Sequence, residues 1–329
     1  MGIAATLRSI VRHIGFFGNK GSLFYTRVKY LTAKTMHLMM SEDQYARWFY
    51  KLYMKKKLNL ENPQTVGDKM WWLKLHNKNP LMHLCSDKVA VRDYVTKHGY
   101  ASTLMPLIDV LNRVDELDLT KYTEEVIVKC SHNSGGHLFY DPAHPISMES
   151  LESGKKVLSY LLKQDASILS LEWNYKGIPP KLLVEKVVRD RRGNIPKDYK
   201  IWCFNGEPKL LFIYFDRFSQ DNHYNIEHTC NIYDMDFNQL NVQEDIPNSP
   251  EHVKKPEQWD MMKEMARTLS EPFPYCRVDL YNIDERVYFG ELTFYDGGGC
   301  VSLHPEEWDR RVAGWIDINS KKVIVGQNN

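Results

Sequence analysis

Apolar positions along the chain follow helical spacing in some segments and strand spacing in others. Helical spacing, bounded by caps or turns, predicts helices over residues 41–57, 66–76, 87–98, 148–163 and 256–270. Short apolar or alternating runs predict strands over residues 126–129, 137–140, 181–188, 199–204, 209–215, 275–281 and 287–294. Helices dominate the front of the chain and strands its C-terminal half, which predicts an α+β fold around antiparallel sheets.

Two pairs of these strands are predicted to form hairpins. Asn205-Gly206 separates two apolar runs, and this dipeptide is a strong hairpin signal because both residues accept the positive φ of a tight turn. The second hairpin turns at residues 282–285 and runs up to Gly297-Gly298-Gly299.

The second hairpin groups charged side chains on its strands. Because side chains alternate along a strand, Arg277 and Asp279 share one face, and Glu291 and Thr293 share a face of the partner strand. If the register sets these faces together, two carboxylates converge, and they repel unless a cation lies between them. Hard oxygen ligands suit Mg²⁺ that bridges phosphates. The alternative is a solvated outer face with an Arg–Asp ion pair.

Two further patterns are candidates for binding. Lys129 ends a strand and precedes a glycine-containing loop, residues 131–136, whose backbone N–H groups could surround phosphate oxygens; an ordinary turn is the alternative. The loop matches neither G-x-x-x-x-G-K-[ST] nor G-x-G-x-x-G. Asp234 and Asp236 form an Asp-x-Asp pair, the pattern with which many glycosyltransferases hold a divalent cation, although so short a pattern also arises by chance.

Composition narrows the functional classes. The 329 residues suggest two domains, and 43 basic against 42 acidic residues argue against a uniformly basic nucleic-acid binder and an acidic disordered chain. No apolar run approaches the roughly 20 residues of a membrane span. Six cysteines without a C-x-x-C pair argue against a zinc ribbon or a disulfide scaffold and fit a reducing compartment. We therefore expect a cytoplasmic protein that does not bind nucleic acid.

The N-terminal segment departs from this charge balance. Residues 1–57 contain eleven basic and two acidic residues, and apolar residues recur at helical spacing between Ile3 and Ile14. Such a basic amphipathic helix either docks on the protein's own core or contacts an anionic polymer or membrane. The second alternative would place the protein at the inner face of the membrane as a peripheral protein.

Six short stretches, taken in order, resemble the TupA-like branch of the ATP-grasp superfamily, which is associated with teichuronopeptide and capsular polysaccharide biosynthesis. The resemblance covers residues 58–314 and is carried by residues 86–92, 128–136, 184–186, 198–206, 277–281 and 290–294. It implies an ATP-grasp fold, in which ATP lies between two α+β lobes with antiparallel sheets. The implied division is a basic helical segment (1–57), a helix-rich region (58–120), lobe 1 (121–195) and lobe 2 with the metal site (196–329).

The resemblance implies a nucleotide-binding set. Lys88 and Lys129 resemble lysines that reach the ATP phosphates, and Glu185 resembles the acid that meets the adenine or ribose. The loop that would close over the triphosphate contains three small residues, Ser134, Gly135 and Gly136.

The resemblance also implies a catalytic set. Lys200 is similar to a further phosphate-contacting lysine, Arg277 to the arginine that steadies the transferred phosphoryl group, and Asp279 and Glu291 to the Mg²⁺ ligands. Two positions depart from the superfamily pattern: Thr293 stands where an asparagine is usual, and residues 295–299 replace a Pro-Gly.

The function implied is an ATP- and Mg²⁺-dependent carboxylate–amine ligase of cell-surface polysaccharide or teichuronopeptide biosynthesis, acting through an acyl phosphate. Its substrates would be a glycan or uronic-acid carboxylate and an amine or amino acid. The main alternative is a glycosyltransferase that uses Asp234 and Asp236. An inactive scaffold is a weaker alternative, because a scaffold needs neither both lysines nor both carboxylates.

Overall fold

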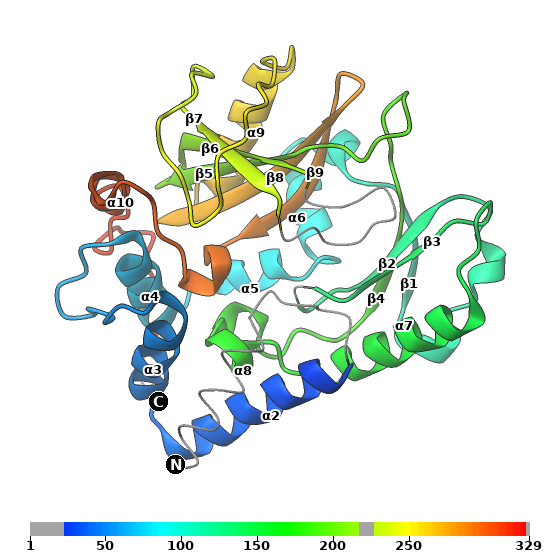
Figure 1. Ribbon diagram of the computed structural model, residues 1–329, viewed down its shortest axis with the longest axis horizontal. Coiled ribbons are helices and arrows are strands. Elements are labelled where there is room, and N and C mark those ends of the chain that lie inside the picture. The colour runs from blue at the N-terminus through cyan, green and yellow to red at the C-terminus, as the bar shows by residue number, and fades with distance from the viewer. Residues whose placement is uncertain (1–22, 134, 217–226, 327–329) are drawn as a thin grey trace. The chain divides into compact units, whose positions relative to one another are not determined.

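The computed structural model describes residues 23–133, 135–216 and 227–326 (Figure 1). Two compact units divide the chain. The first contains Met1–Leu58 and Leu107–Glu185, and the second contains Asn59–Pro106 and Lys186–Asn329. The amphipathic N-terminal helix expected before residue 15 lies outside the described residues. Within them, no helix is long and apolar enough to cross a bilayer.

The first unit is built on a four-stranded sheet. β4 and β2 are its central strands, β1 pairs antiparallel with β4, and β3 pairs antiparallel with β2. A helix, α7, packs on β2 and β3 and closes an apolar core around them (Figure 1). The bounds are β1 Leu107–Leu111, β2 Val126–Cys130, β3 His137–Tyr140, β4 Leu182–Lys186 and α7 Met148–Leu161.

The helical part of the first unit precedes its sheet in the sequence. α2 (Leu23–Met39) packs on α8 (Ser167–Ser170) and on α3 (Glu42–Met54). α3 begins at a capping box, because the Ser41 hydroxyl accepts the Gln44 N–H while the Gln44 side chain accepts the Ser41 N–H. Three short 3₁₀ turns complete the unit: η2 Val114–Glu116, η3 Leu119–Lys121 and η4 Trp173–Tyr175.

The second unit is built on a five-stranded sheet in the order β7-β6-β5-β8-β9, and every neighbouring pair is antiparallel. The strands are β5 Asp198–Phe204, β6 Glu207–Phe215, β7 Thr229–Tyr233, β8 Tyr275–Ile283 and β9 Arg286–Thr293. The helices are α4 Val66–His76, α5 Pro80–Ser86, α6 Val91–Lys97, α9 Trp259–Ser270 and α10 Glu306–Ala313, with 3₁₀ turns η1 Ala101–Thr103 and η5 Asp296–Gly299.

Local sequence explains where several of these elements begin and end. Asn205 and Gly206 have φ of 51° and 86° and join β5 to β6, so the predicted hairpin is confirmed. The helix predicted over residues 87–98 begins only at Val91. The Asp87 side chain accepts the Val89 N–H at 2.9 Å, and this local turn replaces the first helical turn.

The two faces of the five-stranded sheet differ in character. α9 packs on β5, β6 and β8, and the Cys203 thiol donates to the Ala266 carbonyl on the face that α9 covers. Since side chains alternate, Lys200 and Trp202 of β5 point to the opposite face. That face carries the charged residues predicted from the second hairpin.

Gly136 provides a test of the packing between α7 and the loop that joins β2 to β3. Its φ is +64°, and a Cβ at this position would lie 1.9 Å from Leu161 Cδ1. We expect Gly136→Ala to destabilise the protein by about 1–3 kcal/mol through overpacking, beyond the cost of the positive φ. Gly193→Ala is the matched control, since Gly193 has φ +82° and open space around it. Equal melting temperatures for the two variants would contradict this packing.

Candidate active site

Three neighbouring strands bring the predicted catalytic residues into one row. Lys200 of β5 lies opposite Asp279 of β8, and Asp279 lies opposite Glu291 of β9. Arg277, two positions before Asp279, lies opposite Thr293. The register therefore sets the two predicted faces of the second hairpin together.

A β-bulge between β8 and β9 pairs the charged residues on one face of the hairpin and the apolar residues on the other. Leu280 lies opposite Phe289 while Asp279 lies opposite Glu291, which leaves Gly290 as the additional residue of β9. A Cβ on Gly290 would come within 3.0 Å of the Asp279 carbonyl oxygen. A glycine at this position therefore lets β9 approach β8 closely behind the Asp279 carboxylate.

Arg277 connects the charged side chains. Its Nε lies 2.6 Å from Asp279 Oδ1 and its Nη2 lies 2.7 Å from Asp279 Oδ2 and 3.1 Å from Glu291 Oε1. Lys200 Nζ forms an ion pair with Asp279 Oδ2. Asp279 is only 3% exposed, so the alternative of a solvated outer face does not hold for this row. The Glu291 side chain, at 41% exposure, is its accessible end.

Asp296 is a member of the cluster that the sequence analysis did not identify. Its carboxylate accepts Arg277 Nη1, the Trp202 Nε1–H at 3.0 Å and the Gly297 N–H at 2.9 Å. The carboxylate thus joins the guanidinium of β8, a fully buried indole of β5 and the glycine turn η5. An aspartate directly before a run of three glycines was the available sequence signal.

The glycine turn η5 is held on a second side by a buried lysine. Lys74 of α4 is fully buried, donates to the Gly298 carbonyl, and places its ammonium 3.6 Å from the centre of the Trp71 ring. Its cation–π contact substitutes in part for lost hydration. The glycine turn η5 is therefore anchored at Asp296 and at Gly298.

Glu244 is a second carboxyl group that the sequence analysis did not identify. It is buried, and its Oε2 accepts the Tyr214 hydroxyl at 2.8 Å. Burial, reinforced by the negative charge of Asp296, raises the pKa of Glu244 to about 7. Burial lowers the pKa of Arg277, but Asp279 and Asp296 raise it by more, so this guanidinium stays charged.

The donor chemistry of the cluster fits magnesium carried by phosphates. Asp279, Glu291 and Asp296 outnumber the cations Lys200 and Arg277 even before Glu244 ionises. No group of three or more His, Cys, Asp or Glu side chains in the described parts of the chain is arranged to enclose a metal. Mg²⁺ commonly takes one or two carboxylates and completes its shell with phosphate oxygens and water. Two hard carboxylates beside two cations match that requirement.

The first unit contains a separate pair of predicted nucleotide residues. Lys129 of β2 donates to Glu185 of β4 at 2.9 Å, and their side chains are 33% and 12% exposed. The following loop is anchored at its start, since the buried Ser131 N–H donates to the Lys181 carbonyl at 2.9 Å. Gly135 has a positive φ of 85°, and Ser134 lies outside the described residues.

Lys88 lies in the second unit, in the turn formed by residues 87–90 before α6, and is half-buried. Its assignment as a phosphate lysine stays a prediction.

The Asp-x-Asp pair has a structural explanation. Asp234 Oδ1 accepts the N–H groups of Asp236 and Asn238 at 3.0 and 2.8 Å, and its Oδ2 accepts the Asn238 side-chain amide at 3.0 Å. Both oxygens of Asp234 therefore stabilise the turn after β7. This bonding does not favour the glycosyltransferase alternative.

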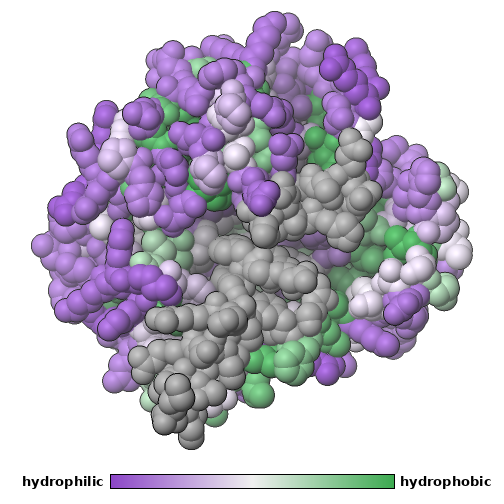
Figure 2. All heavy atoms as spheres, in the orientation of Figure 1, coloured by the Kyte–Doolittle hydropathy of each residue, from purple (hydrophilic) through white to green (hydrophobic). Residues whose placement is uncertain are grey.

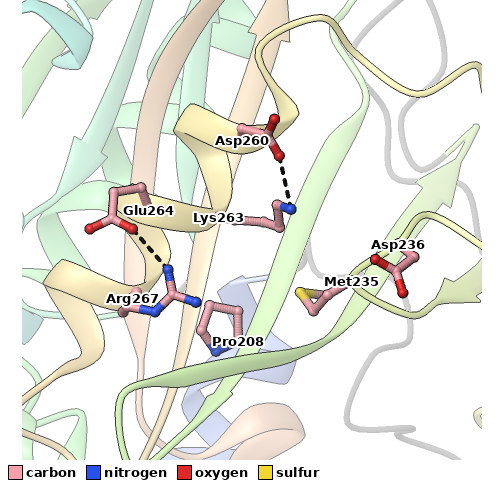
Figure 3. Close-up of a pocket in the computed structure, with 7 residues that line it drawn as sticks. All are labelled: Pro208, Met235, Asp236, Asp260, Lys263, Glu264 and Arg267. Atoms are coloured by element: carbon pink, nitrogen blue, oxygen red, sulfur yellow. Dashed lines mark hydrogen bonds and ion pairs between the residues drawn. The ribbon is translucent and has the colours of Figure 1, made fainter.

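Asp236 lines a surface pocket of about 330 Å³ beside α9 (Figure 3). Two pairs of ions form much of its wall, Asp260 with Lys263 and Glu264 with Arg267, each at 2.8 Å. The cluster around Arg277 lies on the other face of the sheet. The remaining lining residues are Pro208 and Met235.

The bonding of Asp296 predicts a stability cost for its removal. Asp296→Asn keeps the shape but directs an amide N–H at Arg277 or Trp202, so we expect a loss of about 2 kcal/mol of unfolding free energy. Chemical denaturation measures it. Asp260→Asn, which alters the exposed pair with Lys263, is the control and should leave stability unchanged. An Asp296→Asn variant as stable as the control would contradict the role given to this carboxylate.

The raised pKa of Glu244 predicts a pH-dependent stability. Between the ordinary value of 4.5 and about 7, the unfolded chain loses the proton while the folded chain keeps it. The contribution of Glu244 to the free energy of unfolding therefore falls as pH rises through this window and is level above it. Glu244→Gln should lack this fall, giving a difference from the wild type of at most about 3 kcal/mol between acid and mildly alkaline buffer. Parallel denaturation profiles against pH would refute the shift.

Comparison with known proteins shows the family of the chain. A family described as TupA-like ATP-grasp matches residues 68–316. Similar solved structures include the D-alanine–D-alanine ligases of Helicobacter pylori (14% identity, TM-score 0.42, 79% of this chain and 69% of that chain) and of Bacillus anthracis (15%, 0.39, 64% and 57%). Phosphoribosylamine–glycine ligase of Thermotoga maritima is similar at 14% identity, with a TM-score of 0.40 and coverage of 67% and 50%.

The chain thus spans little more than half of the length of the Bacillus anthracis ligase. No curated protein matches it. The α+β fold with two antiparallel sheets agrees with the expected ATP-grasp fold. Because the family match extends over more than half of its residues, the chain belongs to the TupA-like ATP-grasp family.

Proposed function

We propose that this member of the TupA-like ATP-grasp family is an ATP- and Mg²⁺-dependent carboxylate–amine ligase. One observation carries the proposal: a buried arginine, Arg277, bonded to Asp279, Glu291 and Asp296, with Lys200 on the same row of the sheet. Phosphoryl transfer relies mainly on positioning and on neutralising charge, and this cluster supplies fixed cations and hard oxygen ligands for both.

Each residue of the cluster has a role in this proposal. Lys200 and Arg277 neutralise the phosphoryl group in transfer, and Asp279 and Glu291 hold the metal. Magnesium, when bound, would neutralise part of the negative charge on the phosphate groups. Asp296 keeps the guanidinium of Arg277 oriented before substrate arrives, so little reorganisation accompanies the reaction.

The reaction proceeds in two displacements. An oxygen of the substrate carboxylate attacks the γ-phosphorus of ATP, and the bond to the β–γ bridging oxygen breaks. ADP departs, and the substrate carboxylate becomes an acyl phosphate. The amine nitrogen then attacks the acyl carbon and expels inorganic phosphate, so that an amide forms and the amine proton passes to solvent. Lys200 and Arg277 act electrostatically and transfer no proton in this scheme.

The first unit contributes the other nucleotide residues in this proposal. Lys129 offers an ammonium that Glu185 already orients, and Glu185 meets the adenine or the ribose. Gly135 and Gly136, with Ser134, form the loop over the triphosphate, and Lys88 of the second unit adds a further phosphate contact.

The substrates follow from the resemblance to the TupA branch. A uronic-acid or glycan carboxylate and an amine or amino acid are the pair that an enzyme of polysaccharide or teichuronopeptide biosynthesis joins. Activation by ATP places the reaction in the cytoplasm, before the glycan leaves the cell.

The test is a thermal-shift comparison of Mg²⁺-ATP with UDP-sugars on the wild type, Glu291→Gln and Asp234→Asn. A ligand at about 100 times its dissociation constant adds roughly 2.7 kcal/mol of stability. We expect Mg²⁺-ATP to stabilise the wild type and Asp234→Asn alike, and Glu291→Gln much less, because its metal ligand is neutralised. Release of ADP upon addition of uronic acids and amino acids would then identify substrates.

A different pattern would overturn the proposal. Stabilisation by a UDP-sugar and not by Mg²⁺-ATP, lost in Asp234→Asn and kept in Glu291→Gln, would move the active site to the Asp-x-Asp turn.

A further inference from the structure

The outward face of α2 exposes large apolar side chains at regular intervals. Phe24, Leu31 and Leu38 are 75%, 66% and 84% exposed and lie seven positions apart, so they fall on one face of the helix. We call these three residues the apolar stripe. Figure 2 shows hydrophobic atoms at the surface where α2 runs in Figure 1.

The stripe is additional to the face with which α2 packs inside its own unit. That inner face contains the buried Ala33 and Met36, and α2 is fixed there by His37, whose Nε2 donates to the Ile168 carbonyl at 2.8 Å. Tyr30 accepts the Asp165 N–H through its hydroxyl at 3.1 Å. The helix is therefore already docked on its core, and the stripe is a second apolar surface.

The charged residues of α2 itself have one sign. α2 contains no acidic residue, and Arg27 and Lys34, themselves seven positions apart, are exposed beside the stripe. The guanidinium of Arg27 lies 5.3 Å from the centre of the Tyr160 ring, which holds it at the rim. The first acids beyond the helix are Glu42 and Asp43, and Asp43 is paired with Arg47 at 2.8 Å.

This charge pattern discriminates among three occupants. A second copy of α2 would set arginine and lysine against the same residues, and like charges oppose such a dimer. Residues 1–22 contain three basic and no acidic residues, so the chain's own N-terminal segment carries the same sign. An anionic lipid surface supplies both the opposite charge for Arg27 and Lys34 and an apolar phase for the stripe.

We propose that α2 docks the protein on an anionic membrane, with the apolar stripe in the boundary between headgroups and acyl chains and Arg27 and Lys34 on lipid phosphates. Side chains of this kind on a helix parallel to the membrane are typical of interfacial helices. The proposal assigns the contact to α2, separate from the segment between Ile3 and Ile14, and does not depend on the proposed ligase activity.

The test is co-sedimentation of the full chain with vesicles of phosphatidylglycerol and phosphatidylcholine, against phosphatidylcholine alone. We expect binding to the anionic vesicles only. Replacing the stripe (Phe24→Gln, Leu31→Gln, Leu38→Gln) should lower the partition coefficient at least about tenfold, because apolar insertion and charge attraction act together. The matched control replaces exposed apolar residues of α5, α7 and α9 (Leu84→Gln, Met148→Gln, Met261→Gln) and should bind as the wild type does.

A charge variant keeps the test decisive if the stripe variant folds poorly. Arg27→Gln with Lys34→Gln should lower binding to anionic vesicles about 25-fold, since each of the two cations near such a surface contributes roughly 1 kcal/mol, a factor of about five. Unchanged binding in the charge variant or in a folded stripe variant would overturn the proposal, as would equal binding to neutral vesicles. A wild-type dimer that the stripe replacement dissociates would assign the stripe to a second copy instead.

Discussion

The second unit depends on one constraint, the burial of the Arg277 guanidinium. A buried cation is costly unless carboxylates and hydrogen bonds replace its hydration. Arg277 obtains these from its own strand through Asp279, from the next strand through Glu291 and from the turn after that strand through Asp296. The register of β8 with β9 and the anchoring of the glycine turn η5 are therefore parts of the same requirement, because each delivers one of the three carboxylates.

Supplying three carboxylates to one guanidinium leaves a surplus of negative charge, which Lys200 offsets from β5 by pairing with Asp279. Burial raises the pKa of Glu244, and the neighbouring negative charge of Asp296 raises it further. The cluster is thus balanced by cations that are fixed and by a carboxyl group that can remain neutral. A site of this kind can accept a divalent cation together with anionic phosphates without an overall change in the sign of its charge.

Alternation along strands predicted that Arg277 and Asp279 share one face and that Glu291 and Thr293 share another, because a period of two fixes the face of every side chain in a regular strand. Whether the two faces meet depended on the hairpin register, which the structure supplies. The Asn205-Gly206 hairpin was predicted for an equally local reason.

Asp296 and Glu244 were not found, because both lie in irregular segments where no period relates a residue to its surroundings. α2 was expected only as part of a helical segment over residues 1–57, without bounds: it is apolar on its inner face and again along Phe24, Leu31 and Leu38, so no single apolar face marks where the helix begins and ends. The role of Asp234 was ambiguous in the sequence, since the same residues fit both a metal-binding Asp-x-Asp pair and a turn that an aspartate side chain caps.

The strand register gives Thr293 a structural role, although this residue replaces the asparagine that is usual in the superfamily. A hydroxyl in place of the usual asparagine amide looks like the loss of a metal ligand. In the structure Thr293 lies opposite Arg277 and its hydroxyl donates to Glu291 Oε1 at 3.2 Å, the same oxygen that Arg277 Nη2 contacts at 3.1 Å. One oxygen of Glu291 is thereby held from two sides, while the side chain remains partly exposed. Thr293 therefore orients Glu291, and in the proposed ligase, where Glu291 holds the metal, the coordination that an asparagine would supply would fall to phosphate oxygens or water.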